Sequence, residues 1–129
     1  MLVKLRALTV FAALSISACL VEPGNVVAHA VVTESSLRAT PIKPEKETPV
    51  MLHFNSRVEL SLSKFELVRK GDTHEAVTAK PGSKPGQIIV VIPPLSPGDY
   101  AIHYKVFAAD GHLTEDIMRF SVAAQPGSR

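Results

Sequence analysis

Two short stretches of the sequence carry residues that can bind a metal ion. Asp110 and His112 flank Gly111 in a turn that follows a segment of alternating apolar and polar residues. A carboxylate and an imidazole separated by one flexible glycine can converge on a single ion. The second stretch is His29-Ala30, which follows a segment with the features of an export signal. Together they predict a metal site formed by His29, Asp110 and His112.

The donors of this predicted site favour copper. A histidine at the start of a chain offers its α-amine and its ring Nδ1 to one ion, and the amine, whose pKa in an unstructured peptide is about 7.7 to 8.0, loses its proton at small cost near neutrality. Adding His112 and Asp110 gives three nitrogen donors and one oxygen donor. Such a set in one plane suits Cu(II) better than tetrahedral Zn(II), and copper heads the affinity order of the divalent ions. The predicted site therefore binds Cu(II), and no residue is predicted to be catalytic.

The site depends on how the chain is processed. Residues 1–28 contain an early positive charge (Lys4, Arg6), an apolar run over Ala7–Leu20 and small residues near the end of Val26–Ala28, which is typical of a signal peptide. The apolar run is too short to span a bilayer as a helix. These features predict cleavage directly before the histidine, export to a bacterial periplasm and no membrane span in the processed chain.

A second processing route competes with this one. Ile16–Cys19 resembles the motif of a bacterial lipoprotein, in which Cys19 is acylated and becomes the first residue. That route would leave His29 inside the chain and remove its free amine. The two routes exclude each other, and we predict cleavage before His29.

The processed chain is a single small domain. It comprises a β domain over residues 29–124 and a polar tail over residues 125–129, and it contains no cysteine, so an apolar core must hold it together. It has 12 Lys and Arg against 11 Asp and Glu, because the leader removes Lys4, Arg6 and Glu22. This near-balance provides no basic field for nucleic acid or anionic lipid.

The periodicity of the sequence predicts an all-β fold. No segment keeps a helical period, and turn signals recur every eight to twelve residues, which is typical of a Greek-key β-sandwich or barrel of about seven strands, immunoglobulin-like in architecture. The expected strands are an edge strand within residues 29–37, residues 50–54, residues 58–68 with a break near Ser63-Lys64, a short strand within residues 74–79, residues 87–92 buried on both faces, residues 100–106 and residues 118–122.

The other histidines are weaker candidates. His53 alternates with apolar residues, so it is expected on the outer face of its strand, where it could lie beside the metal. His74 and His103 are expected to be solvated rather than to coordinate an ion. Met51 and Met118 are far apart in sequence, which argues against a methionine-rich Cu(I) site.

The sequence resembles the CopC family of periplasmic copper-resistance proteins. The similarity is carried by His29-Ala30, by residues 49–54, by residues 93–100 and by residues 104–112. It implies a Greek-key β-barrel or sandwich in which Cu(II) is bound by the N-terminal histidine with the Asp and His of the last motif, here His29, Asp110 and His112. It also implies a role in copper tolerance or supply, often beside a CopD-like membrane partner.

Three positions depart from the family pattern. Asn55-Ser56 stands where an acidic residue is usual after the second motif, so a further carboxylate near the metal is in doubt. Tyr104 stands where tryptophan is common, and Leu113 replaces a frequent proline.

Two other functions are compatible with the residues. An N-terminal histidine chelate also serves copper enzymes that oxidise polysaccharides, but those present a flat aromatic surface, whereas this chain has two Tyr and no Trp. The sequence therefore predicts no enzyme. The alternative is a metal-free structural or adhesion β-sandwich, anchored as a lipoprotein at Cys19. The first residue of the processed chain distinguishes this metal-free alternative from the copper-binding protein, because acylation at Cys19 would leave His29 inside the chain.

Overall fold

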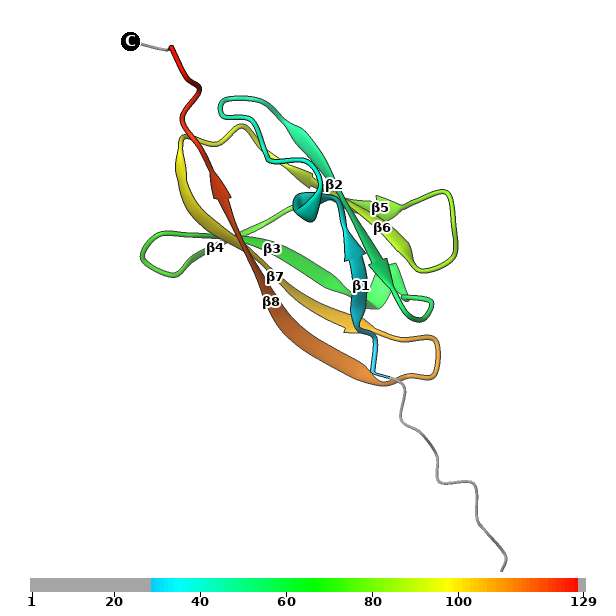
Figure 1. Ribbon diagram of the computed structural model, residues 1–129. Coiled ribbons are helices and arrows are strands. Elements are labelled where there is room, and N and C mark those ends of the chain that lie inside the picture. Colours follow the sequence, from blue (N-terminus) through cyan, green and yellow to red (C-terminus); the bar gives the residue numbers. More distant parts are fainter. Residues whose placement is uncertain (1–28, 128–129) are drawn as a thin grey trace, which may run out of the picture.

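Two antiparallel four-stranded sheets make up the computed structural model, which describes residues 29–127 (Figure 1). One sheet has the strand order β1-β2-β6-β5 and the other β4-β3-β7-β8. The strands are β1 (Val32–Ser35), β2 (Thr48–Phe54), β3 (Lys64–Arg69), β4 (Thr73–Ala76), β5 (Ala79–Pro81), β6 (Gln87–Ile92), β7 (Gly98–Phe107) and β8 (Leu113–Val122). The predicted signal peptide, the competing lipoprotein motif at Cys19 and the last two residues lie outside the described part.

Helical structure is limited to two single turns in the described residues. They are the 3₁₀ helices η1 (Ser36–Arg38) and η2 (Leu60–Leu62). Within residues 29–127 no helix has the length and apolar character needed to cross a bilayer. The all-β prediction is confirmed.

The core lies between the two sheets and is built by period-two alternation. Along β2 the inward residues are Val50, Leu52 and Phe54, all at most 1% exposed, and they alternate with half-exposed neighbours. From the opposite sheet, β7 contributes Ile102 and Val106 to the same core. Because successive side chains of a strand point to opposite faces, each sheet keeps one apolar face inward and one face toward solvent.

The segment from Val58 to Leu62 was wrongly predicted as strand. Val58 makes a single bridge to Ala108, after which the chain turns through η2, where Leu62 is 63% exposed. The turn is fixed by Ser63, whose hydroxyl donates to the Glu59 carbonyl at 2.8 Å and accepts from the Phe107 amide at 3.0 Å. A serine side chain that hydrogen-bonds to backbone groups competes with the hydrogen bonds of a strand ladder. Here the serine contacts stabilise a turn, and the strand does not form. The predicted break near Ser63 is where β3 begins.

Other strand predictions need smaller corrections. The part of the chain that the structure describes forms eight strands where about seven were expected, since the single strand expected within residues 74–79 is divided into β4 and β5, and β5 extends into residues expected to be loop. The face of β6 that includes Ile89 and Val91 is partly exposed rather than buried, because within residues 29–127 the two sheets are the only layers and this face is turned away from the other sheet. Strand β8 begins at Leu113 rather than Met118, since it pairs with β7 along its full length.

The buried phenol of Tyr104 should make the stability of the fold depend on pH in the alkaline range. Its ring is 3% exposed and packs against Phe54 and Phe65, with centroids 5.6 and 6.2 Å away. Burial, reinforced by the charge of Asp116, raises the pKa of Tyr104 from 10.0 to about 12. The fold thus favours the neutral phenol, so this stabilisation is complete below pH 10 and is lost as the pH rises toward 12, by at most about 2 to 3 kcal/mol.

The measurement is the free energy of unfolding in denaturant between pH 9 and 12, for the native chain and for Tyr104→Phe. Other groups also titrate in this range, so the difference between the two chains isolates the phenol. The native chain should lose stability relative to Tyr104→Phe as the pH rises. Parallel curves would contradict the assignment.

Candidate metal centre

Asp110, Gly111 and His112 form the turn that joins β7 to β8. The turn is closed by hydrogen bonds from the Gly111 amide to the Ala108 carbonyl and from the Ala108 amide to the His112 carbonyl, both 2.9 Å. Gly111 has a φ of +85°, a left-handed conformation that costs glycine little and other residues more. The glycine between the two predicted ligands is therefore required by the shape of this turn.

The structure brings Asp110 and His112 into direct contact. One carboxylate oxygen accepts from the His112 amide at 3.0 Å, and the other lies 3.0 Å from His112 Nδ1. The pKa of Asp110 is lowered, mainly by the hydrogen bond from the backbone of His112. Both side chains are about half exposed, at 42% and 48%. The turn thus presents an ionised carboxylate and an imidazole to solvent, side by side.

The segment that follows β2 forms backbone contacts with the end of β7, directly before this turn. The Ala109 amide donates to the Arg57 carbonyl at 3.0 Å, and the Glu59 amide donates to the Phe107 carbonyl at 2.8 Å. Ala108 is 1% exposed and forms the bridge with Val58. The chain that leads into the turn is therefore fixed by backbone contacts directly before the two predicted ligands.

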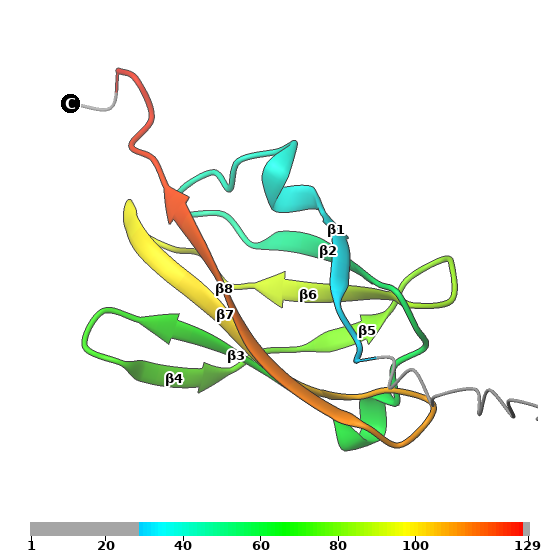
Figure 2. The same ribbon diagram turned by 60° about the horizontal axis from the view of Figure 1, so that its bottom comes forward.

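The start of the described chain lies next to the same turn, as both ribbon views show (Figures 1 and 2). Ala30 is fully buried, and its amide donates to the Thr114 hydroxyl at 3.2 Å. Thr114 is two residues beyond His112, at the beginning of β8. This contact places the backbone of His29 at the end of the sandwich that carries Asp110 and His112.

Asn55 holds this N-terminal arm from the other side. The Asn55 side-chain oxygen accepts a hydrogen bond from the backbone amide of Val31 at 2.9 Å, and the backbone amide of Asn55 donates to the Val31 carbonyl at 2.9 Å. The position that departs from the family pattern thus anchors the segment next to His29. Asn55 and Thr114 are positioning residues that the sequence did not reveal, because both act on backbone that is distant in the chain.

The His29 ring is not gathered with the other two predicted ligands. In residues 29–127, the group of three metal-ligating side chains whose ligand atoms all lie within 4.8 Å is a different one, described below. His29 is exposed. In the full-length chain its nitrogen is also a peptide amide, so the predicted chelate through the α-amine requires cleavage before this residue.

His53 lies on the outer face of β2, as its alternation predicted. Its ring is beside Gly86 in the turn between β5 and β6, where an added Cβ would come within 3.6 Å of it. The carbonyl of His53 accepts from the Thr33 hydroxyl at 3.1 Å, which ties β1 to β2. These contacts give His53 a place in the sheet rather than in the β7–β8 turn.

A cluster that the sequence did not predict lies on the outer face of the other sheet. It consists of Glu66 on β3, His74 on β4 and His103 on β7. Glu66 Oε2 lies 3.1 Å from Nδ1 of each histidine, and the two rings are 5.4 Å apart. His74 is exposed and His103 is partly buried, and each ring also contacts two carboxylates, which the sequence did not predict.

The contacts within this cluster favour the ionised form of Glu66 and the protonated form of His74. The Lys64 ammonium forms an ion pair with Glu66 at 2.7 Å. Hydrogen bonds from Lys64, and to a smaller extent from His103 and His74, lower the pKa of Glu66 to about 2. The pKa of His74 is raised, first by Glu66 and then by Asp72. The carboxylate is therefore ionised across the whole physiological pH range.

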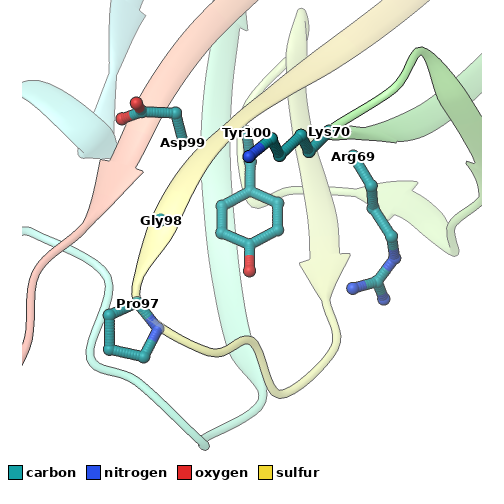
Figure 3. Close-up of a pocket in the computed structure, with 6 residues that line it drawn as sticks. All are labelled: Arg69, Lys70, Pro97, Gly98, Asp99 and Tyr100. Atoms are coloured by element: carbon teal, nitrogen blue, oxygen red, sulfur yellow. The ribbon is translucent and has the colours of Figure 1, made fainter.

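A hollow of about 630 Å³ lies at the far end of β7 from the turn. It is lined by Arg69, Lys70, Pro97, Gly98, Asp99 and Tyr100 (Figure 3). The Arg69 guanidinium is bound to Glu75 at 2.8 Å, and the Tyr100 hydroxyl donates to the Ser96 carbonyl at 2.7 Å. Figure 3 shows the Asp99 carboxylate pointing away from Arg69 and Tyr100. None of the predicted metal ligands lines this hollow.

Comparison with known proteins agrees with this architecture. The family model of the CopC domain matches residues 32–123. CopC from Methylosinus trichosporium OB3b superposes with a TM-score of 0.63 at 23% identity, covering 74% of this chain and 94% of that chain. PcoC, a methionine-rich copper resistance protein from Escherichia coli, has a TM-score of 0.53 at 24% identity, covering 74% of this chain and 99% of that chain.

No curated protein sequence matches the chain. At such identities the two solved structures establish the shared β-sandwich, while the family model establishes the relationship. Because that model spans β1 to β8, the chain belongs to the CopC domain family.

Proposed function

We propose that the processed protein is a periplasmic Cu(II)-binding protein that sequesters or delivers copper. Its ligands are the α-amine and ring of His29, the His112 imidazole and the Asp110 carboxylate. The proposal is supported by membership of the CopC family and by the similarity to PcoC, which is named for copper resistance. The observation that carries it is the contact of Asp110 with His112 in a turn beside the N-terminal arm.

The chemistry of the site fits a copper carrier rather than an enzyme. Two imidazoles, an amine and a carboxylate hold Cu(II) well, whereas Cu(I) prefers soft sulfur ligands, and none is among these four groups. Half-exposed ligands at the tip of a sandwich can exchange an ion with a partner. A CopD-like inner-membrane protein is the partner that the family suggests, and the processed chain would meet it from the periplasm.

The first test is the N-terminus of protein exported by a bacterial host, determined by intact mass and sequencing. The same sample is titrated with Cu(II) and followed by electron paramagnetic resonance. We expect a chain that begins at His29 and binds one copper with a nitrogen-rich tetragonal signal. His103→Gln is titrated in parallel, so that any copper held by the cluster of Glu66, His74 and His103 is not counted.

The matched control is a chain that keeps one residue before His29. It has the same side chains but no free histidine amine, so it should lose the chelate and bind Cu(II) more weakly. Equal affinity of the two chains would contradict the N-terminal chelate. A chain that begins at an acylated Cys19, or that takes up no stoichiometric copper, would instead support the metal-free structural sandwich.

A further inference from the structure

Glu66, His74 and His103 come from three neighbouring strands and point to the same outer face of their sheet. The register pairs Glu66 with His103, and it pairs His74 with Val68, which lies two residues from Glu66 on the same face of β3. We propose that these three side chains form a second metal site, suited to Zn(II). The proposal is independent of the copper site in the β7–β8 turn, because no ligand is shared.

The spacing of the ligand atoms is close to what zinc requires. Two atoms bound to a tetrahedral Zn(II) at about 2.0 to 2.1 Å lie roughly 3.4 Å apart. Glu66 Oε2 is 3.1 Å from Nδ1 of His74 and 3.1 Å from Nδ1 of His103, and one ligand atom from each of the three residues lies within 4.8 Å of the other two. An ion could therefore enter with small side-chain movements and no change of backbone.

The second nitrogen of each histidine is already held as in known metal sites. Histidines that bind a metal usually donate their other ring N–H to a carboxylate or carbonyl, which fixes the tautomer and the ring orientation. Here His74 Nε2 lies 3.0 Å from Asp72, and His103 Nε2 lies 2.8 Å from Glu115. Both rings are thus arranged to present Nδ1 to an ion in front of Glu66.

The remaining contacts favour zinc with one open position. The Lys64 ammonium binds Glu66 Oε1 at 2.7 Å, which leaves Oε2 as a single oxygen ligand. Two imidazoles and one carboxylate leave the fourth tetrahedral position for water, which is a common zinc arrangement. The rings are inclined at 81° to each other, and the three side chains are only 13% to 35% exposed. The ion would be sheltered but reachable from solvent.

The test is calorimetric titration with Zn(II) alone of the exported protein carrying His112→Ala, which removes a ligand of the proposed copper site. We expect one Zn(II) per chain. His103→Gln, or the more exposed His74→Gln, should weaken this binding by more than about 100-fold. Glu115→Gln keeps all three ligands but removes the carboxylate behind His103, and such changes typically cost about 10- to 100-fold in affinity.

The control is His53→Gln, on the outer face of the other sheet, which should leave Zn(II) binding unchanged. Nuclear magnetic resonance of the imidazoles gives a second readout that does not depend on a variant folding. Zn(II) should shift the ring signals of His74 and His103 together. Equal affinity of the parent and His103→Gln, or ring signals of this pair that do not respond, would overturn the site and leave the cluster as an ion-pair network. Neither result depends on whether copper binds at the turn.

Discussion

Replacing His112 by alanine is expected to weaken Cu(II) binding by the processed chain by more than about 100-fold. Loss of an outer partner of a metal ligand typically costs about 10- to 100-fold, and loss of the ligand itself should cost more. The His112 side chain is 48% exposed, and its backbone contacts in the turn are kept. The fold should therefore remain intact, and competition with a chelator of known affinity measures the effect.

Asp110→Asn should have a smaller effect, of about tenfold. The amide keeps an oxygen that can accept from the His112 amide, but it lacks the negative charge that a cation favours. The pKa of Asp110 lies below its usual value, so the native carboxylate is fully ionised at neutral pH. The matched control is Asp99→Asn, at the far end of β7, which should bind copper like the native chain. If His112→Ala retained the native affinity, the turn could not be the site.

The part of the proposed copper site that lies within one turn could be predicted from sequence, while its third proposed ligand could not be fully placed. Asp110 and His112 are two residues apart, so local geometry alone brings them together. The position of His29 depends on Ala30 meeting Thr114, 84 residues later. It also depends on Asn55, which binds Val31 across the β1–β2 pair. Such contacts follow from strand pairing, and alternation does not specify which strands pair.

The cluster around Glu66 was missed for the same reason. Alternation correctly placed His103 on an outer face, but an outer face is usually solvated, so the pattern carried no sign of a partner. Glu66 and His103 are 37 residues apart, and they meet because β3 pairs with β7 in one particular register. Neither that pairing nor the neighbouring position of His74 on β4 can be inferred from the spacing of histidines.

The strands were predictable where one face is buried throughout, as in β2 and β7. The error at residues 58–62 arose because Val58, Leu60 and Leu62 have the spacing of a strand, although Leu62 faces solvent. The decisive contact is the Ser63 hydroxyl bridging Glu59 and Phe107, and its second partner lies 44 residues away. A long-range side-chain contact therefore decided a local structure.

Leu52→Ala is expected to cause the largest loss of stability among the changes considered, about 2 to 5 kcal/mol. Leu52 is fully buried in the middle of β2, between β1 and β6, and its side chain enters the core between the sheets. Truncation removes apolar burial and leaves a cavity that rigid strands on both sides cannot close. Domains of this size have total stabilities of about 5 to 15 kcal/mol, so the variant should unfold at a temperature lower by at least roughly 8 °C and by up to roughly 40 °C.

Leu62→Ala is the matched control, because it makes the same chemical change at a side chain that is 63% exposed in η2. Its free energy of unfolding should change by less than about 0.5 kcal/mol. Below its unfolding temperature Leu52→Ala should still bind one Cu(II) per chain, since Leu52 belongs to the core between the sheets and not to the β7–β8 turn, whereas His112→Ala should stay folded and fail to bind. A Leu52→Ala protein as stable as Leu62→Ala would show that the core is not organised around β2. Loss of copper binding by a folded Leu52→Ala protein would show that core packing, and not the turn alone, positions the ligands.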